Sequence, residues 1–228
     1  INVLTGDAAA IGGEIAVNPT VRKVSFTGST EVGRQLAADC APTLKRMSLE
    51  LGGNAPFMVF DDADLDKALD LAMGSKFRNA GQTCICANRF LVQSGIHDRF
   101  VDGLAARVKA LRVGNGLDPD TDMGPLINAR AVERVDAMVR DAEAKGARLL
   151  VGGHRHALGG NFYEPTLLTG LKPDMRVFQG EIFGPVAAVM PFVTEEEAVA
   201  LANDTSYGLA SYVCTRDLAR TWRLFGAL

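Results

Sequence analysis

The chain has 228 residues, of which 47% are hydrophobic and 22% charged, a composition typical of a globular protein with one or two real cores. The net charge of −3 lacks the basic excess of proteins that bind nucleic acid or anionic membranes. No run approaches the roughly 20 apolar residues of a membrane span, so we expect a cytoplasmic protein that acts on a small molecule.

Strand-like apolar runs alternate with segments of helical period, which predicts an α/β fold with a mainly parallel sheet. The expected strands are 24–26, 44–51, 55–60, 89–93, 186–192 and 210–214. The expected helices are 31–41, 64–77, 98–111, 129–145 and 195–203. Asp64 and Thr194 have the side chains that cap helix N-termini. The pair Gly52 and Gly53 marks the expected domain border, because two glycines let the backbone turn sharply.

The four cysteines are too few for a disulfide scaffold and lack the paired spacing of a zinc site, so we expect reduced thiols and no metal. They are Cys40, Cys84, Cys86 and Cys214. The chain starts without a Met and stops within an amphipathic run, which predicts a fragment of a longer protein.

The first candidate site is the turn at Gly28 and Ser29, between a strand and a helix. Such a turn presents backbone N–H groups and a hydroxyl to a ligand, and phosphate is a suitable one. The segment is not a GxGxxG motif, and a tight turn without a ligand is an equally good interpretation.

Glu50 ends the strand that precedes the two glycines. Period-2 alternation puts it on the polar face of that strand, opposite Met47, Leu49 and Leu51. Ligands of open α/β sheets bind at the carboxyl ends of strands, where a carboxylate can act as a general base. A solvated glutamate at the sheet edge is the alternative interpretation.

Cys84 lies in a polar loop between a helix and a strand, at the end of residues 77–84 (Phe-Arg-Asn-Ala-Gly-Gln-Thr-Cys). Most cysteines are buried and structural. Arg78 is near in sequence, however, and a positive neighbour favours the reactive thiolate. Cys84 is therefore a candidate nucleophile that needs no paired His.

Three ordered motifs resemble the aldehyde dehydrogenase superfamily. They are residues 48–56 (Ser-Leu-Glu-Leu-Gly-Gly-Asn-Ala-Pro), 81–84 (Gly-Gln-Thr-Cys) and 181–185 (Glu-Ile-Phe-Gly-Pro), and the resemblance continues through 123–127 and 203–210. Within the superfamily, residues 46–56 and 77–89 are most similar to succinate-semialdehyde dehydrogenases. Enzymes acting on glutarate semialdehyde share many of the residues in these two segments.

The resemblance implies a three-layer αβα fold with helices on both faces of the sheet. Residues 1–51 would be the C-terminal portion of the cofactor-binding domain and 52–228 the catalytic domain. The implied cofactor is NAD or NADP, the substrate is an aldehyde that carries a carboxylate, and the full-length protein is a homodimer or homotetramer.

By the same resemblance, Cys84 attacks the aldehyde, the thiohemiacetal loses hydride to NAD(P)+, and Glu50 activates the water that hydrolyses the resulting thioester. The turn at Gly28 and Ser29 is expected beside the cofactor pyrophosphate. The resemblance also implies that Leu51 lies beside the nicotinamide. Glu181 would bind the hydroxyls of the nicotinamide ribose, and Phe183 would pack close to it. A surface acid before a turn is the alternative for Glu181.

Arg78 resembles the family arginine that pairs with the substrate carboxylate, a role that suits the planar guanidinium. The alternative is an arginine that caps its own helix C-terminus. Cys86 is two residues from Cys84, and this spacing predicts a reversible disulfide between the two thiols. The alternative is that Cys86 is a buried thiol with no role in the reaction.

Two rival functions remain open from the sequence. One is a related aldehyde dehydrogenase that acts on glutarate semialdehyde or another aldehyde. The other is a non-catalytic folding or assembly module produced as a fragment.

Overall fold

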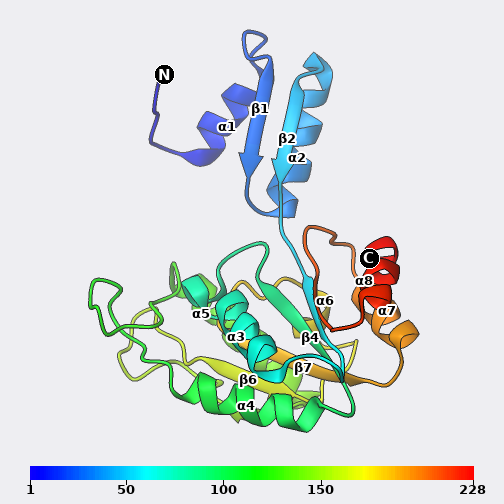
Figure 1. Cartoon of the computed structure of the whole chain (residues 1–228). Helices are drawn as coiled ribbons and strands as arrows, with labels where there is room; N and C mark the ends of the chain where they lie inside the picture. Colours follow the sequence, from blue (N-terminus) through cyan, green and yellow to red (C-terminus); the bar gives the residue numbers. More distant parts are fainter. The chain divides into compact units, whose positions relative to one another are not determined.

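The computed structural model describes all 228 residues, which divide into two compact units, Ile1–Gly52 and Gly53–Leu228. Figure 1 shows the elements of both units. The division falls at the two glycines where the sequence predicts a domain border. Each unit has a hydrophobic core of its own, and the roles expected for the two units stay predictions.

The first unit is a two-stranded parallel sheet with helices. Its elements are α1 (Ala8–Val17), β1 (Lys23–Thr27), α2 (Thr30–Cys40), the 3-10 helix η1 (Ala41–Thr43) and β2 (Arg46–Glu50). The register runs from Lys23 opposite Arg46 to Thr27 opposite Glu50. Its small core centres on Ala16, Val24 and Cys40.

Helix α1 is not among the elements expected from the sequence. Its interior contains Gly12 and Gly13, which lower the helix propensity of the segment. Asp7 compensates at the N-terminus, because its carboxylate accepts a hydrogen bond of 2.7 Å from the N–H of Ala10.

The second unit contains a six-stranded sheet. Its strands are β3 (Ala55–Val59), β4 (Ala87–Gln93), β5 (Arg148–Val151), β6 (Thr166–Thr169), β7 (Val186–Phe192) and β8 (Tyr212–Cys214). Its helices are α3 (Leu65–Lys76), η2 (Arg78–Gly81), α4 (His97–Lys109), α5 (Ala129–Ala144), α6 (Arg176–Gln179), α7 (Glu195–Asn203) and α8 (Leu218–Ala227). The strand order is β5-β6-β7-β4-β3-β8, and only the β5–β6 pair is antiparallel.

Both faces of this sheet are covered by helices (Figure 1). Alternate residues of β3 face opposite sides, so that Phe57 packs in the core formed with α3, α4 and α5, and Met58 packs in the core formed with α6, α7 and α8. A strand that is buried on both faces reads as a continuous apolar run. The expected three-layer α/β architecture with a mainly parallel sheet is confirmed.

The helix starts expected at Asp64 and Thr194 are confirmed. The Asp64 carboxylate accepts from the N–H of Lys67 at 3.3 Å, and the Thr194 hydroxyl accepts from the N–H of Glu197 at 3.2 Å. No helix in either unit has both the length and the apolar character needed to cross a membrane.

Candidate active site

In the first unit, the turn at Gly28 and Ser29 lies beside Glu50. Because β1 and β2 are parallel, their carboxyl ends meet at one edge, and the N–H of Gly28 donates to the carbonyl of Glu50 at 3.0 Å. Ser29 caps α2, where its hydroxyl oxygen accepts from the N–H of Val32 at 3.3 Å. The hydroxyl proton of Ser29 remains free to bond another acceptor. The Glu50 side chain is exposed on the polar face of β2.

Leu51 packs against α2 within the same unit. The terminal methyl groups of Leu51 lie against Gly33, so a Cβ at position 33 would force the leucine side chain to shift. The structure thus brings together Gly28, Ser29, Glu50 and Leu51 at one end of the two strands.

In the second unit, the loop before Cys84 has an unusual backbone. Asn79, Ala80 and Gly81 have φ values of 55°, 52° and 73°, which is the left-handed region. A non-glycine residue there is strained and persists only where its surroundings hold it. Here the side chains of Asn79 and Gln82 each bond to the other's carbonyl, at 3.0 and 3.1 Å. The N–H of Ile127 also donates to the Gln82 side chain at 2.8 Å.

Cys84 is half-buried, and three contacts hold the backbone around it. The N–H of Cys86 donates to the carbonyl of Thr83 at 3.1 Å, which closes a turn. The hydroxyl of Tyr212 donates to the carbonyl of Ile85 at 2.6 Å. Gly53 lies so close to the carbonyl of Cys84 that a Cβ at position 53 would overlap its oxygen.

Glu181 is half-buried, and its Oε1 accepts from the N–H of Gly53 at 3.1 Å. Burial is the main cause of the raised pKa of Glu181, and the Gly53 bond, Arg134 and Lys76 act in the opposite direction. These contacts argue against a plain surface acid. Phe183 has a φ of 48°, and Arg134 donates to the carbonyls of Glu181 and Phe183 at 3.2 and 3.4 Å.

Two buried asparagines fix the segment that carries Glu181. Asn88 accepts from the N–H of Ile182 at 3.0 Å and donates to the carbonyl of Gly180 at 2.9 Å. It also donates to Asn54 Oδ1 at 2.5 Å. Neither asparagine is a candidate from the sequence, because the asparagines and their hydrogen-bond partners lie up to 151 residues apart along the chain.

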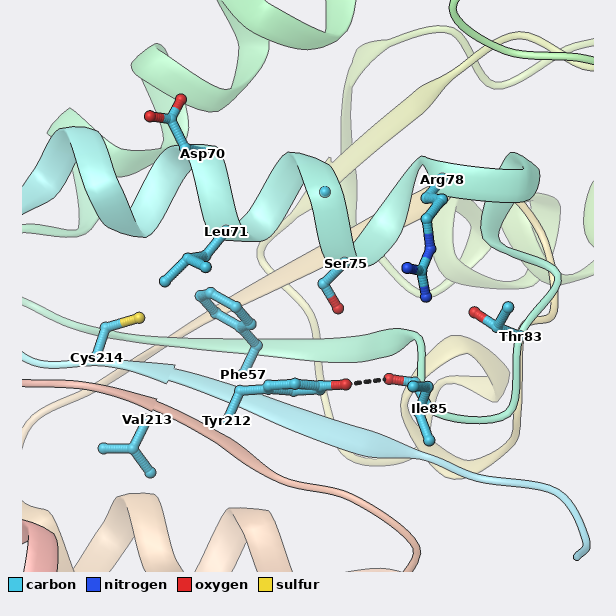
Figure 2. A pocket seen from close by; sticks show the side chains of 11 residues that line it. Phe57, Asp70, Leu71, Ser75, Arg78, Thr83, Ile85, Tyr212, Val213 and Cys214 are labelled. Carbon is cyan, nitrogen blue, oxygen red and sulfur yellow. Dashed lines mark hydrogen bonds between the residues drawn. The ribbon is translucent and has the colours of Figure 1, made fainter.

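Arg78 lines a cavity of about 300 Å³ beside the Cys84 loop. Figure 2 shows its guanidinium directed into this space near the hydroxyls of Ser75 and Thr83. Asp70, the only carboxylate in the lining, is paired with Arg107 instead. Arg78 is therefore exposed and available to an anion.

Cys86 is buried, with 6% of its surface exposed, as its alternative interpretation expects. All four cysteines are free thiols.

Lys76 lies next to Cys86, whose thiol donates to the backbone carbonyl of Lys76 at 3.6 Å. The Lys76 side chain is fully buried, and its Nζ has no hydrogen-bond partner. Burial lowers the pKa of Lys76, and the nearby Cys86 and Glu181 act against that shift. The chain contains no group of three His, Cys, Asp or Glu side chains that could hold a metal ion.

Within the second unit, the structure thus brings Cys84 and Glu181 to a common neighbour, Gly53, and places Arg78 on the cavity beside the Cys84 loop. Sequence reasoning missed Tyr212 and Gly53 as parts of the site. A single sequence carries a signal for Gly53 only, as the second of two adjacent glycines.

A family model described as the aldehyde dehydrogenase family matches residues 1–228. The chain is 55% identical over 223 residues to glutarate-semialdehyde dehydrogenase of Pseudomonas aeruginosa, covering 98% of this chain and 46% of that protein. It is 54% identical over 227 residues to succinate-semialdehyde dehydrogenase (NADP+) of Escherichia coli, covering 100% and 47%. It is 55% identical over 223 residues to 3-sulfolactaldehyde dehydrogenase of Pseudomonas putida, covering 98% and 46%. The chain spans about half the length of the curated relatives it matches.

The solved structures that match the chain are also aldehyde dehydrogenases. Succinate-semialdehyde dehydrogenase from Burkholderia pseudomallei matches with a TM-score of 0.98 at 58% identity, covering 99% of this chain and 47% of that one. Betaine aldehyde dehydrogenase from Staphylococcus aureus in complex with NAD+ matches with a TM-score of 0.92 at 40% identity, covering 97% and 45%. Relatives of the chain therefore bind NAD+ or NADP+.

Proposed function

The chain belongs to the aldehyde dehydrogenase family, and we propose that it forms the catalytic part of an enzyme that oxidises succinate semialdehyde to succinate with NAD(P)+. The observation that carries the proposal is the loop of Cys84, whose neighbours Thr83 and Ile85 line a cavity that also holds Arg78. A thiol nucleophile and a free guanidinium beside one cavity suit an aldehyde with a carboxylate at its other end.

In the proposed reaction the Cys84 thiolate adds to the aldehyde carbon, so that an S–C bond forms and the carbonyl oxygen becomes the alkoxide of a thiohemiacetal. When bound, the dinucleotide supplies the acceptor for the hydride that leaves this carbon. The alkoxide electron pair then restores the C=O bond, which gives a thioester on Cys84. Glu50 takes a proton from water, the water oxygen attacks the thioester, and the C–S bond breaks to return the thiolate and release the acid.

The proposed assignment gives residues 1–51 to the cofactor-binding domain and 52–228 to the catalytic domain. The donor set suits a dinucleotide. The turn at Gly28 and Ser29 opens α2, and N–H groups at the start of a helix favour phosphate. Only Oε1 of Glu181 is bonded to Gly53, which leaves Oε2 to accept from a ribose hydroxyl. Leu51 and Phe183 would contact the nicotinamide end.

A second candidate function is the oxidation of a different aldehyde with an acidic tail. Relatives of similar identity are named for succinate semialdehyde, glutarate semialdehyde and 3-sulfolactaldehyde. A guanidinium binds a carboxylate or a sulfonate through the same pair of N–H donors. The test is to measure kcat/KM of the full-length protein for each of these three aldehydes. The aldehyde with the highest kcat/KM identifies the substrate.

The direct test of the proposal is Cys84→Ala in the full-length protein, with Cys40→Ala, which removes a buried thiol of the first unit, as the matched control. We expect Cys84→Ala to abolish dehydrogenase and esterase turnover with an unchanged melting temperature, because the thiol forms the covalent intermediate. Activity that survives in Cys84→Ala would refute the assignment. Turnover by residues 1–228 alone tests the alternative of a non-catalytic module, and light scattering tests the proposed homodimer or homotetramer.

A further inference from the structure

Tyr212 is the one side chain from another element that hydrogen-bonds the residue after Cys84. Its hydroxyl donates to the carbonyl of Ile85 at 2.6 Å, at the short end of the normal range for an O–H···O bond. Figure 2 shows this bond crossing from β8 to the loop along the edge of the cavity. The phenol proton is thereby committed to the loop and does not serve a ligand in the cavity.

The ring of Tyr212 is held firmly enough to act as a fixed point. Tyr212 pairs with Phe57 in the parallel register of β8 and β3, and the two rings are 5.8 Å apart at a tilt of 35°. Phe57 in turn packs at 5.2 Å against Phe90 in the main core. A rigid aromatic side chain that is anchored in this way loses little conformational entropy when its hydroxyl bonds the loop.

Two successive carbonyls of the loop are therefore held from different parts of the second unit. The carbonyl of Cys84 lies against Gly53, and the carbonyl of Ile85 accepts from Tyr212. Because peptide groups are planar, fixing both carbonyls fixes the two peptide planes on either side of Ile85. The Cα of Cys84 lies in the first of these planes, and the turn in which the N–H of Cys86 donates to the carbonyl of Thr83 holds the peptide before it. Together these restraints limit where the Cys84 side chain can point.

We propose that Tyr212 is a positioning residue that aims the Cys84 thiol through the Ile85 carbonyl. The expected effect of Tyr212 on turnover rests on the proposed function. The effect of Tyr212 on the geometry of the Cys84 loop does not depend on which aldehyde is oxidised. A nucleophile misplaced by about 1 Å can lose about 100-fold in rate, so the loss of one of two anchors is expected to cost about tenfold.

The test is Tyr212→Phe in the full-length protein, which removes the hydroxyl and keeps the ring against Phe57. The matched control is Tyr207→Phe, because the Tyr207 hydroxyl makes no hydrogen bond within the chain. Three quantities are measured: kcat for the aldehyde, KM for the dinucleotide, and the rate of Cys84 alkylation by iodoacetamide, followed by peptide mass spectrometry. Thermal unfolding verifies that each variant is folded.

In Tyr212→Phe we expect kcat to fall about tenfold and the Cys84 alkylation rate to change at least about threefold, with KM for the dinucleotide unchanged. Tyr207→Phe should match the wild type in all three. A folded Tyr212→Phe protein whose Cys84 alkylates at the wild-type rate would overturn the proposal, whatever its kcat. If Cys84→Ala remained active, the proposed function would fail, but the alkylation rates would still decide whether Tyr212 positions the loop.

Discussion

Gly53 lies against the backbone carbonyl of Cys84, in a space where no Cβ fits. The same residue donates its N–H to Glu181 at 3.1 Å. One residue without a side chain thus joins the Cys84 loop to the segment that carries Glu181, the proposed ribose ligand. Protein interiors are close-packed, so an added methyl group at this point must displace one of the two segments.

Gly53→Ala is therefore expected to lower the stability of the fold by about 1–3 kcal/mol, the usual cost of overpacking. It should also lower kcat/KM by at least about tenfold, because a shift of the Cys84 loop misplaces the thiol. Thermal unfolding and steady-state kinetics measure the two effects. Gly226→Ala is the control, since nothing lies within 4 Å of a Cβ there. Equal behaviour of the two variants would contradict the packing argument.

Short-range sequence signals predicted much of the fold. Asp64 and Thr194 mark helix starts because their side chains act within one helical turn. The strands β5 and β6 were missed, because four-residue segments beside the glycine-rich stretch 152–160 carry too little periodicity.

The candidate site was predictable only in part. The sequence motifs identified Cys84 and Glu181, which are 97 residues apart. They did not show that Gly53 contacts both of these segments. Tyr212 bonds to Ile85 across 127 residues of sequence. Such a contact depends on the parallel pairing of β8 with β3, which no local pattern specifies.

Glu50→Gln is expected to separate the two halves of the proposed reaction. The amide cannot act as a base, so thioester hydrolysis should slow while hydride transfer continues. Rapid mixing should then show a burst of reduced cofactor, close to one equivalent per active site, followed by slow turnover. The Ser48→Ala variant, on the same face of β2, is the control. Loss of the burst together with turnover would indicate that Glu50 supports the structure instead.

Cys86 provides a test of redox sensitivity. If the two thiols of Cys84 and Cys86 are oxidised by hydrogen peroxide to a disulfide and two waters, activity should be lost and should return with dithiothreitol. Cys86→Ala removes the partner thiol, so dithiothreitol should no longer restore full activity after prolonged peroxide. Cys40→Ala, which removes a buried thiol of the first unit, is the control. Wild-type recovery in Cys86→Ala would exclude the intramolecular disulfide.

The prediction for Arg78 rests on charge. In the proposed reaction the carboxylate of succinate semialdehyde would leave water on entering the cavity, and an anion without a partner is costly to bury. Arg78 is the cation that lines this cavity, and the one carboxylate there is already paired with Arg107. Removing a charge-assisted hydrogen bond costs about 1.5–3 kcal/mol. Arg78→Ala should therefore lower kcat/KM for succinate semialdehyde by roughly one to two orders of magnitude.

Uncharged aldehydes provide the internal control for that variant. Butanal has no carboxylate to lose contact with Arg78, so its kcat/KM should change by only about severalfold. Arg99→Ala, an exposed arginine on α4, controls for the loss of one positive charge from the surface. If charged and uncharged aldehydes lost activity equally in Arg78→Ala, the guanidinium would serve the loop instead of the substrate. The preference for an acidic aldehyde would then rest on the names of relatives alone.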